Sequence, residues 1–149
     1  MPSNLAIQLA KHPMASSLIK NPIIVVDVET DGPVPHLYSM VSLGAVVVEP
    51  GLTRVYRGEV APISEIWSPE ALAVSGVSRS QHLAFPKPDV TFPEFHEWIK
   101  SINNGDRCTL ISDNPSFDFM FTAYYLHRYV GECLFGHSGR RINDLYAGS

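Results

Sequence analysis

Two acidic residues alternate at the end of one apolar stretch, an arrangement that suits a metal ion. Residues 23–28 are apolar and mostly β-branched except for Asp27, and Glu29 follows two positions later. Successive side chains of a strand point to opposite faces, so Asp27 and Glu29 share one face. Their carboxylates repel each other and lose water at the end of a buried strand, and a divalent cation relieves both costs. A strand end that simply reaches solvent is the alternative interpretation.

A third acidic residue, Asp118, is expected in the first turn of a helix. That helix, predicted over residues 117–130, follows a short buried strand at 108–112 and a tight turn. The helix dipole alone favours a carboxylate at this position. The helix is apolar nearly all round, however, and the strand before it should lie near the first strand. The Asp118 carboxylate therefore needs a partner, and Asn114 can donate or accept beside it.

Two further strands are expected to form a hairpin. Residues 40–48 are an apolar run that contains Gly44, and residues 52–60 alternate between apolar and polar. The short Pro50–Gly51 turn between them implies antiparallel pairing.

Helices are expected to fill the middle of the chain. Ser68-Pro69 is a helix start that Gly76 ends, and the turn at 75–78 leads into another capped segment. Residues 85–93 are predicted to be loop because they contain three prolines, and residues 92–102 form an amphipathic helix. This order of elements predicts an α/β fold, a mixed β-sheet flanked by helices.

Composition limits the class of protein. A chain of 149 residues suits one globular domain, predicted here over residues 21–149 after an N-terminal arm or short helix at 1–20. It has no apolar run of about 18 residues, so no membrane partner is expected. The two cysteines are interpreted as reduced thiols of a cytoplasmic protein. A net charge of −4 disfavours coating nucleic acid with a basic surface, but not gripping a few nucleotides through metal ions.

Four segments in order resemble the motifs of the DEDD 3′–5′ exonucleases, and the resemblance covers residues 23 to 146. Val26-Asp27-Val28-Glu29-Thr30-Asp31-Gly32 resembles their first motif, and residues 112–121 resemble the second, in which Asn and Phe precede a metal-binding Asp. Residues 71–78 resemble the helix and glycine turn between these motifs, and residues 142–145 resemble the strand that follows.

The resemblance implies a ribonuclease H-like fold and hydrolysis that removes nucleotides from a 3′ end with two metal ions. Asp27, Glu29 and Asp118 would be the catalytic metal ligands, and Mg²⁺ or Mn²⁺ suits such all-oxygen ligation. The implied partner is the 3′ end of nucleic acid, single-stranded rather than duplex, and a homodimer is left open. The residues expected to contact this substrate are Thr30, Asp31 and Asn114.

The third motif of the family, a final metal-binding Asp with a His or Tyr a few residues before it, is missing. In the His-type subgroup, DEDDh, which the chain resembles more than the Tyr type, that His is the general base for the attacking water. His137 and Asp144 are the nearest pair, but their spacing is longer than the family's, and Asp144 fits the strand before the missing helix better. The domain is therefore expected to lack its C-terminal helix, as a truncated or a naturally short relative, and this chain to have little or no nuclease activity. A catalytically inactive module that binds nucleic acid or a protein partner is the alternative, and RNA and DNA both remain open as substrates.

Overall fold

A five-stranded mixed sheet forms the centre of the protein. The structure, a computed structural model, describes residues 4–11, 21–103 and 107–141. The strand order is β3-β2-β1-β4-β5, in which β1, β2 and β3 are antiparallel neighbours and β4 and β5 run parallel to β1. The strands are β1 (Ile23–Thr30), β2 (Met40–Val47), β3 (Val55–Glu59), β4 (Thr109–Ser112) and β5 (Arg140–Arg141). The predicted mixed sheet and the predicted antiparallel hairpin are both confirmed.

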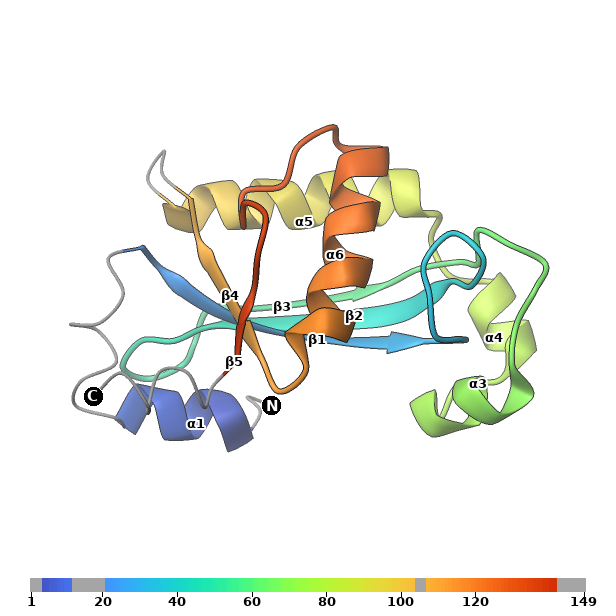
Figure 1. The fold of residues 1–149 in the computed structure, drawn as a ribbon, viewed down its shortest axis with the longest axis horizontal. Helices are drawn as coiled ribbons and strands as arrows, with labels where there is room; N and C mark the ends of the chain where they lie inside the picture. The colour runs from blue at the N-terminus through green and yellow to red at the C-terminus, as the bar shows by residue number, and fades with distance from the viewer. Residues whose placement is uncertain (1–3, 12–20, 104–106, 142–149) are drawn as a thin grey trace.

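Helices lie on both faces of this sheet (Figure 1). Helices α5 and α6 cover one face, whereas α1 and α3 lie against the other face at opposite ends of the sheet. The helices are α1 (Asn4–Lys11), α3 (Pro69–Ser75), α4 (Arg79–Leu83), α5 (Pro88–Asn103) and α6 (Pro115–Tyr129). A cleft lies on this second face, lined by residues of β1, β2 and β3.

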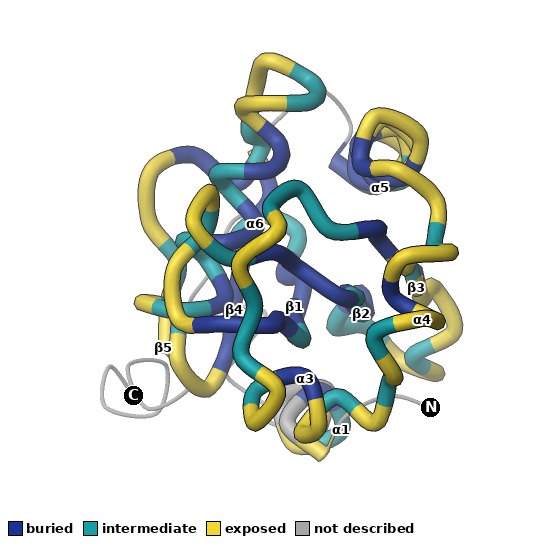
Figure 2. Tube along the Cα trace, turned by 90° about the vertical axis from the view of Figure 1, so that its right-hand side faces the viewer, coloured by how far each residue is buried: buried dark blue, intermediate teal, exposed yellow. Residues whose placement is uncertain are grey.

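The alternation of side chains along β1 creates two apolar clusters. Ile24, Val26 and Val28 pack into the main core with the apolar sides of α5 and α6. Val25 points the other way and joins a smaller cluster that includes Ala6 of α1. A strand buried on both faces explains the continuous apolar run in the sequence. Figure 2 shows the buried strands at the centre, with exposed residues in the surrounding loops.

The predicted capping residues start and end the two short helices. The Ser68 hydroxyl oxygen accepts a hydrogen bond from the Ala71 N–H at 3.2 Å, and Gly76 ends α3 with a positive φ of 76°. Ser78 and Gln81 form a reciprocal capping box at the start of α4. These local signals place the turn between α3 and α4, which borders the candidate site described below.

The predicted loop at residues 85–93 is wrong in its second half, because α5 begins at Pro88 and contains Pro93. A proline inside a helix removes one backbone donor and is normally avoided. Two tertiary contacts support the helix here. The Thr91 hydroxyl donates to the Glu59 carbonyl oxygen at 2.8 Å, and the Phe92 side chain is fully buried in the core. Packing of this turn against β3 therefore outweighs the local preference against helix.

The ends of the chain are described only in part. Helix α1 lies within the segment 1–20 that was predicted as an N-terminal arm or short helix, whereas residues 12–20 lie outside the described residues. Residues 142–149, with the predicted strand segment and Asp144, also lie outside them. No helix in the described part of the chain is both long and apolar enough to cross a membrane.

Candidate active site

Asp27 and Glu29 lie on the open face of β1, opposite α5 and α6. Asp27 is exposed and Glu29 is half-buried, as their alternation with buried Val26 and Val28 requires. Both line a cleft of about 470 Å³ that extends over β1, β2 and β3. The turn that follows α3 also lines this cleft. The first two candidate ligands therefore face one shared, solvent-accessible space.

Asp118 reaches the same strand from the other side. Its Oδ1 accepts a hydrogen bond from the Val28 N–H at 3.1 Å, and its side chain is buried. Val28 is the residue between Asp27 and Glu29, so this contact holds Asp118 against the backbone of the acidic pair. The contact exists because β4 runs parallel beside β1 and α6 starts directly after β4.

Burial and mutual repulsion raise the pKa values of these carboxyl groups. The pKa of Asp118 is raised to about 6, chiefly by burial, against the lowering effect of the Val28 hydrogen bond and with a smaller raising effect from the charge of Asp27. The pKa of Asp27 is raised mainly by burial and secondarily by the charge of Asp113. The pKa of Glu29 is raised mainly by burial and secondarily by the charge of Asp27. The groups thus experience one another's charge, which a cation would compensate.

The donor atoms of this site suit a hard divalent cation. Asp27, Glu29 and Asp118 offer carboxylate oxygens only, the ligand type that Mg²⁺ and Mn²⁺ prefer. Within the described ranges, however, no three His, Cys, Asp or Glu side chains converge closely enough to hold an ion as they stand. The three residues therefore fit a metal ion by the chemistry of their donor atoms, although their side chains do not converge on one point in this structure.

Asp113 is a fourth carboxylate near the site that the sequence reasoning missed. It is exposed directly after β4, and its charge raises the pKa values of both Asp27 and Asp118. The sequence could have indicated Asp113, because the carboxyl ends of neighbouring parallel strands lie at the same edge of a sheet. A residue that directly follows β4 is therefore close to the end of β1.

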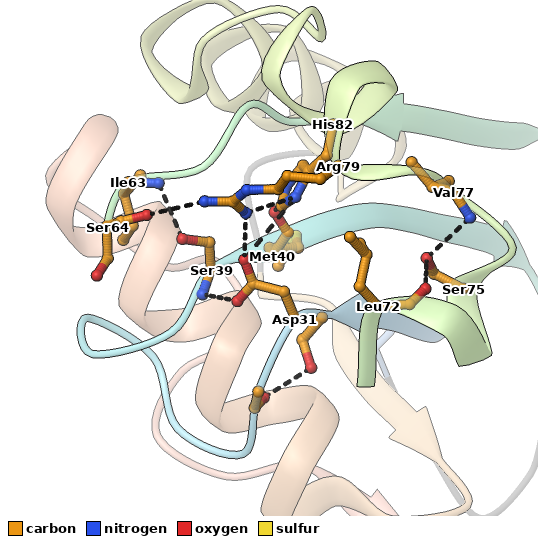
Figure 3. Close-up of polar contacts among 12 residues, drawn as sticks. Asp31, Ser39, Met40, Ile63, Ser64, Leu72, Ser75, Val77, Arg79 and His82 are labelled. Carbon is orange, nitrogen blue, oxygen red and sulfur yellow. Dashed lines mark hydrogen bonds and ion pairs between the residues drawn. The ribbon is translucent and has the colours of Figure 1, made fainter. Parts of the chain in front are cut away.

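Asp31, which was expected to contact substrate, is instead fully buried. One of its carboxylate oxygens accepts a hydrogen bond from the Ser39 N–H at 2.6 Å. The other accepts one from Arg79 Nη1 at 3.0 Å and lies 3.8 Å from Nδ1 of His82. We call Asp31, Arg79 and His82 the Asp31 network (Figure 3). Its carboxylate is enclosed by protein groups, so the structure gives Asp31 an internal structural position instead of contact with substrate.

The Asp31 network joins the end of β1 to the α3–α4 segment. The Ser68 N–H before α3 donates to the Asp31 carbonyl oxygen at 2.8 Å. The guanidinium of Arg79 also lies over the Trp67 ring, 4.9 Å from its centroid. Burial lowers the pKa of His82, so this ring is neutral near pH 7, with Nε2 placed 3.1 Å from the Met40 carbonyl oxygen. These contacts fix the turn after β1 relative to the wall of the cleft.

Thr30 and Asn114, the other two residues expected to contact substrate, occupy different surroundings. The Thr30 side chain is buried, and its hydroxyl donates to the Gly32 carbonyl oxygen at 2.8 Å. Asn114 is exposed at the N-cap of α6, where its side chain makes no capping hydrogen bond. Of the two, Asn114 has the more accessible polar group beside Asp118.

Comparison with known proteins finds one clear curated relative. No protein-family model matches the chain. The chain is 38% identical over 132 residues to the 3′-5′ DNA exonuclease Cap18 of Escherichia coli. That match covers 87% of this chain and 70% of Cap18.

Solved structures with the same fold include exonuclease I proteins. The Escherichia coli enzyme in complex with a dT13 oligonucleotide superposes with a TM-score of 0.63 at 15% identity, over 82% of this chain and 27% of that one. The exonuclease I of Methylocaldum szegediense gives a TM-score of 0.62 at 18% identity, over 83% of this chain and 28% of that one. The chain therefore spans less than a third of these proteins, and at such identities the likeness is one of fold.

Proposed function

Since the chain belongs to the 3′–5′ exonuclease family and has its ribonuclease H-like fold, we propose that its carboxylate site hydrolyses terminal phosphodiester bonds of nucleic acid. The observation that carries this proposal is the hydrogen bond from the Val28 N–H to Asp118. It brings a carboxylate from a distant helix to the residue between Asp27 and Glu29, as a shared metal site requires.

The proposed roles of the residues follow from their placement. Asp27, Glu29 and Asp118 hold two divalent ions, Mg²⁺ or Mn²⁺, once all three are deprotonated. Bound ions of this kind supply an activated water and stabilise the leaving 3′ oxygen. Asp118 keeps a fixed orientation because its Oδ1 accepts a hydrogen bond from the Val28 N–H. Asp27 and Glu29 line the solvent-accessible cleft over the sheet.

Single-stranded DNA is the substrate that we propose. The relative Cap18 is named a DNA exonuclease, and exonuclease I was solved with dT13 and dA16 oligonucleotides. Asn114, exposed at the start of α6, is proposed to contact the strand beside Asp118, and Thr30 to contribute through its backbone at the end of β1. A homodimer is likewise a proposal, which light scattering of the purified protein tests.

A non-catalytic module that binds nucleic acid is the second candidate, and one observation favours it. Among the described residues that line the cleft there is no histidine to serve as a general base. With three carboxylates and no histidine among the described residues that line the cleft, the protein is expected to hydrolyse slowly.

Digestion of end-labelled oligonucleotides distinguishes the two candidates. The chain is incubated with single-stranded DNA or RNA and Mn²⁺, with and without EDTA, beside the Asp27→Ala variant. We expect slow, EDTA-sensitive loss of nucleotides from the 3′ end of DNA that Asp27→Ala abolishes. Binding of DNA without any such loss would favour the non-catalytic module, and equal digestion by Asp27→Ala would reject the carboxylate site.

A further inference from the structure

The cleft extends from the carboxylate pair across two more strands. The pairing registers place Asp27 beside Gly44 of β2, and Gly44 beside Arg57 of β3. Tyr56, the neighbour of Arg57, is buried toward the main core, so Arg57 points to the open face that also carries Asp27. Asp27, Gly44 and Arg57 therefore form one row across the sheet, and all three line the cleft.

Gly44 leaves a depression in the middle of this row. A methyl group built at Gly44 would meet no atom within 4 Å, so the space above its backbone is open. Its φ is not in the left-handed region, and the conformation of β2 therefore does not demand glycine. No side chain therefore separates Asp27 from Arg57 along this row. Their Cα atoms are about 10 Å apart, because two strand spacings lie between them.

Arg57 is the only cation among the described residues that line the cleft, where Asp27, Glu29 and Glu59 are the acidic ones. No described residue forms an ion pair or a side-chain hydrogen bond with its guanidinium. By contrast Arg54, at the turn before β3, is engaged by Glu49 through Nε at 2.7 Å. Arg57 therefore offers five donors to a ligand in the cleft, in a geometry that matches phosphate.

We propose that Arg57 binds a backbone phosphate of a single strand lying across Gly44, on the side of β1 away from Asp118. The inference rests on the proposed function, because the strand that fills the cleft is the proposed substrate. The sheet order supports the placement, since β3 and β4 lie on opposite sides of β1. Asp118 and Arg57 then border the acidic pair from two sides. Arg57 also supplies the positive charge that an acidic protein needs near a phosphate chain.

Salt-dependent binding tests this contact. Affinity for a fluorescent dT oligonucleotide is measured by anisotropy over a range of NaCl concentrations, with Ca²⁺ present and the absence of hydrolysis checked on a gel. Arg57→Gln is expected to bind about tenfold more weakly at low salt, as loss of a charged hydrogen bond implies. The slope of log affinity against log salt is expected to fall by about 0.7, the value for one phosphate contact to a single strand.

Two variants serve as controls. Arg57→Lys keeps the charge and is expected to keep the slope while losing part of the affinity. Arg54→Gln makes the same charge change outside the cleft and is expected to leave both quantities at the wild-type value. Circular dichroism of each variant checks that the fold is kept.

The inference is overturned if Arg57→Gln keeps the wild-type slope and affinity, or if Arg54→Gln lowers the slope equally, because the effect is then one of overall charge. Absence of DNA binding by the wild type at the lowest salt also overturns it. The proposed nuclease function is judged separately by the digestion assay with Asp27→Ala, so the two can fail independently.

Discussion

Removal of the Arg79 side chain should destabilise the protein strongly, because it leaves a buried carboxylate without its cation. In Arg79→Ala the Asp31 side chain, with no exposed surface, keeps the Ser39 N–H at 2.6 Å but loses the guanidinium at 3.0 Å. The neutral His82 beside it cannot replace the charge. The turn after β1 and the start of α4 would both lose a shared anchor.

The expected cost follows from the burial of the pair. Breaking a buried ion pair by removing one partner costs about 3–5 kcal/mol. The Arg79 side chain is 18% exposed, and Asp31 retains one charge-assisted hydrogen bond, so the lower end applies. A loss of about 3 kcal/mol corresponds to a Tm lower by about 9 °C for a domain of this size.

Urea unfolding of four proteins tests this reasoning: the wild type, Arg79→Ala, Asp31→Asn and the double variant. We expect Arg79→Ala to be the less stable single variant, and the double variant to lose about 2 kcal/mol less than the sum of the singles, as for residues in direct contact. Arg79→Lys should recover part of the loss because it restores the charge. A loss below about 1 kcal/mol in Arg79→Ala, or additive effects in the cycle, would refute the role given to the network.

Three further outcomes are expected. Burial raises the pKa of Asp118 from 3.8 to about 6, so between these values the folded protein holds a proton that the unfolded chain has lost. The metal-free protein should therefore lose stability as pH rises through that window. The affinity for Mn²⁺, measured calorimetrically, should increase as pH rises through about 6, because metal binding displaces that proton. An affinity independent of pH from about 5 to 7 would contradict the raised pKa. Gly44→Ala should keep the wild-type Tm, because a Cβ at Gly44 meets no atom within 4 Å, but should weaken DNA binding by narrowing the cleft. Gly58→Ala should instead lower stability by about 1–3 kcal/mol, because its Cβ would lie 2.9 Å from side-chain atoms of both Thr91 and Tyr56; thermal melts of the two variants compare these outcomes directly.

The sequence predicted the features that depend on local pattern. The apolar run ending in Asp27 and Glu29 has the period of a strand, and Ser68 and Gly76 are strong local signals for the ends of α3. The position of Asp118 near β1 was also predictable, because a short strand followed by a helix start implies a parallel neighbour.

The remaining features depend on contacts between distant parts of the chain. Asp31 was expected to contact substrate, whereas it is buried against Arg79, a partner that lies 48 residues later. Arg57 reaches the cleft only through the registers of three strands, which a single sequence does not specify. Pro93 argued against helix locally, whereas packing of Phe92 in the core and the Thr91 hydrogen bond to β3 support one.

A Mn²⁺ titration followed by NMR tests the central claim most directly, namely that Asp27, Glu29 and Asp118 form one divalent metal site. Paramagnetic Mn²⁺ broadens the backbone amide signals of nearby residues. We predict that low concentrations broaden signals at 27–29 and 113–118 first, and that Asp118→Asn removes this selective broadening while the protein stays folded. Broadening that is absent there, or unchanged in Asp118→Asn, would contradict the claim.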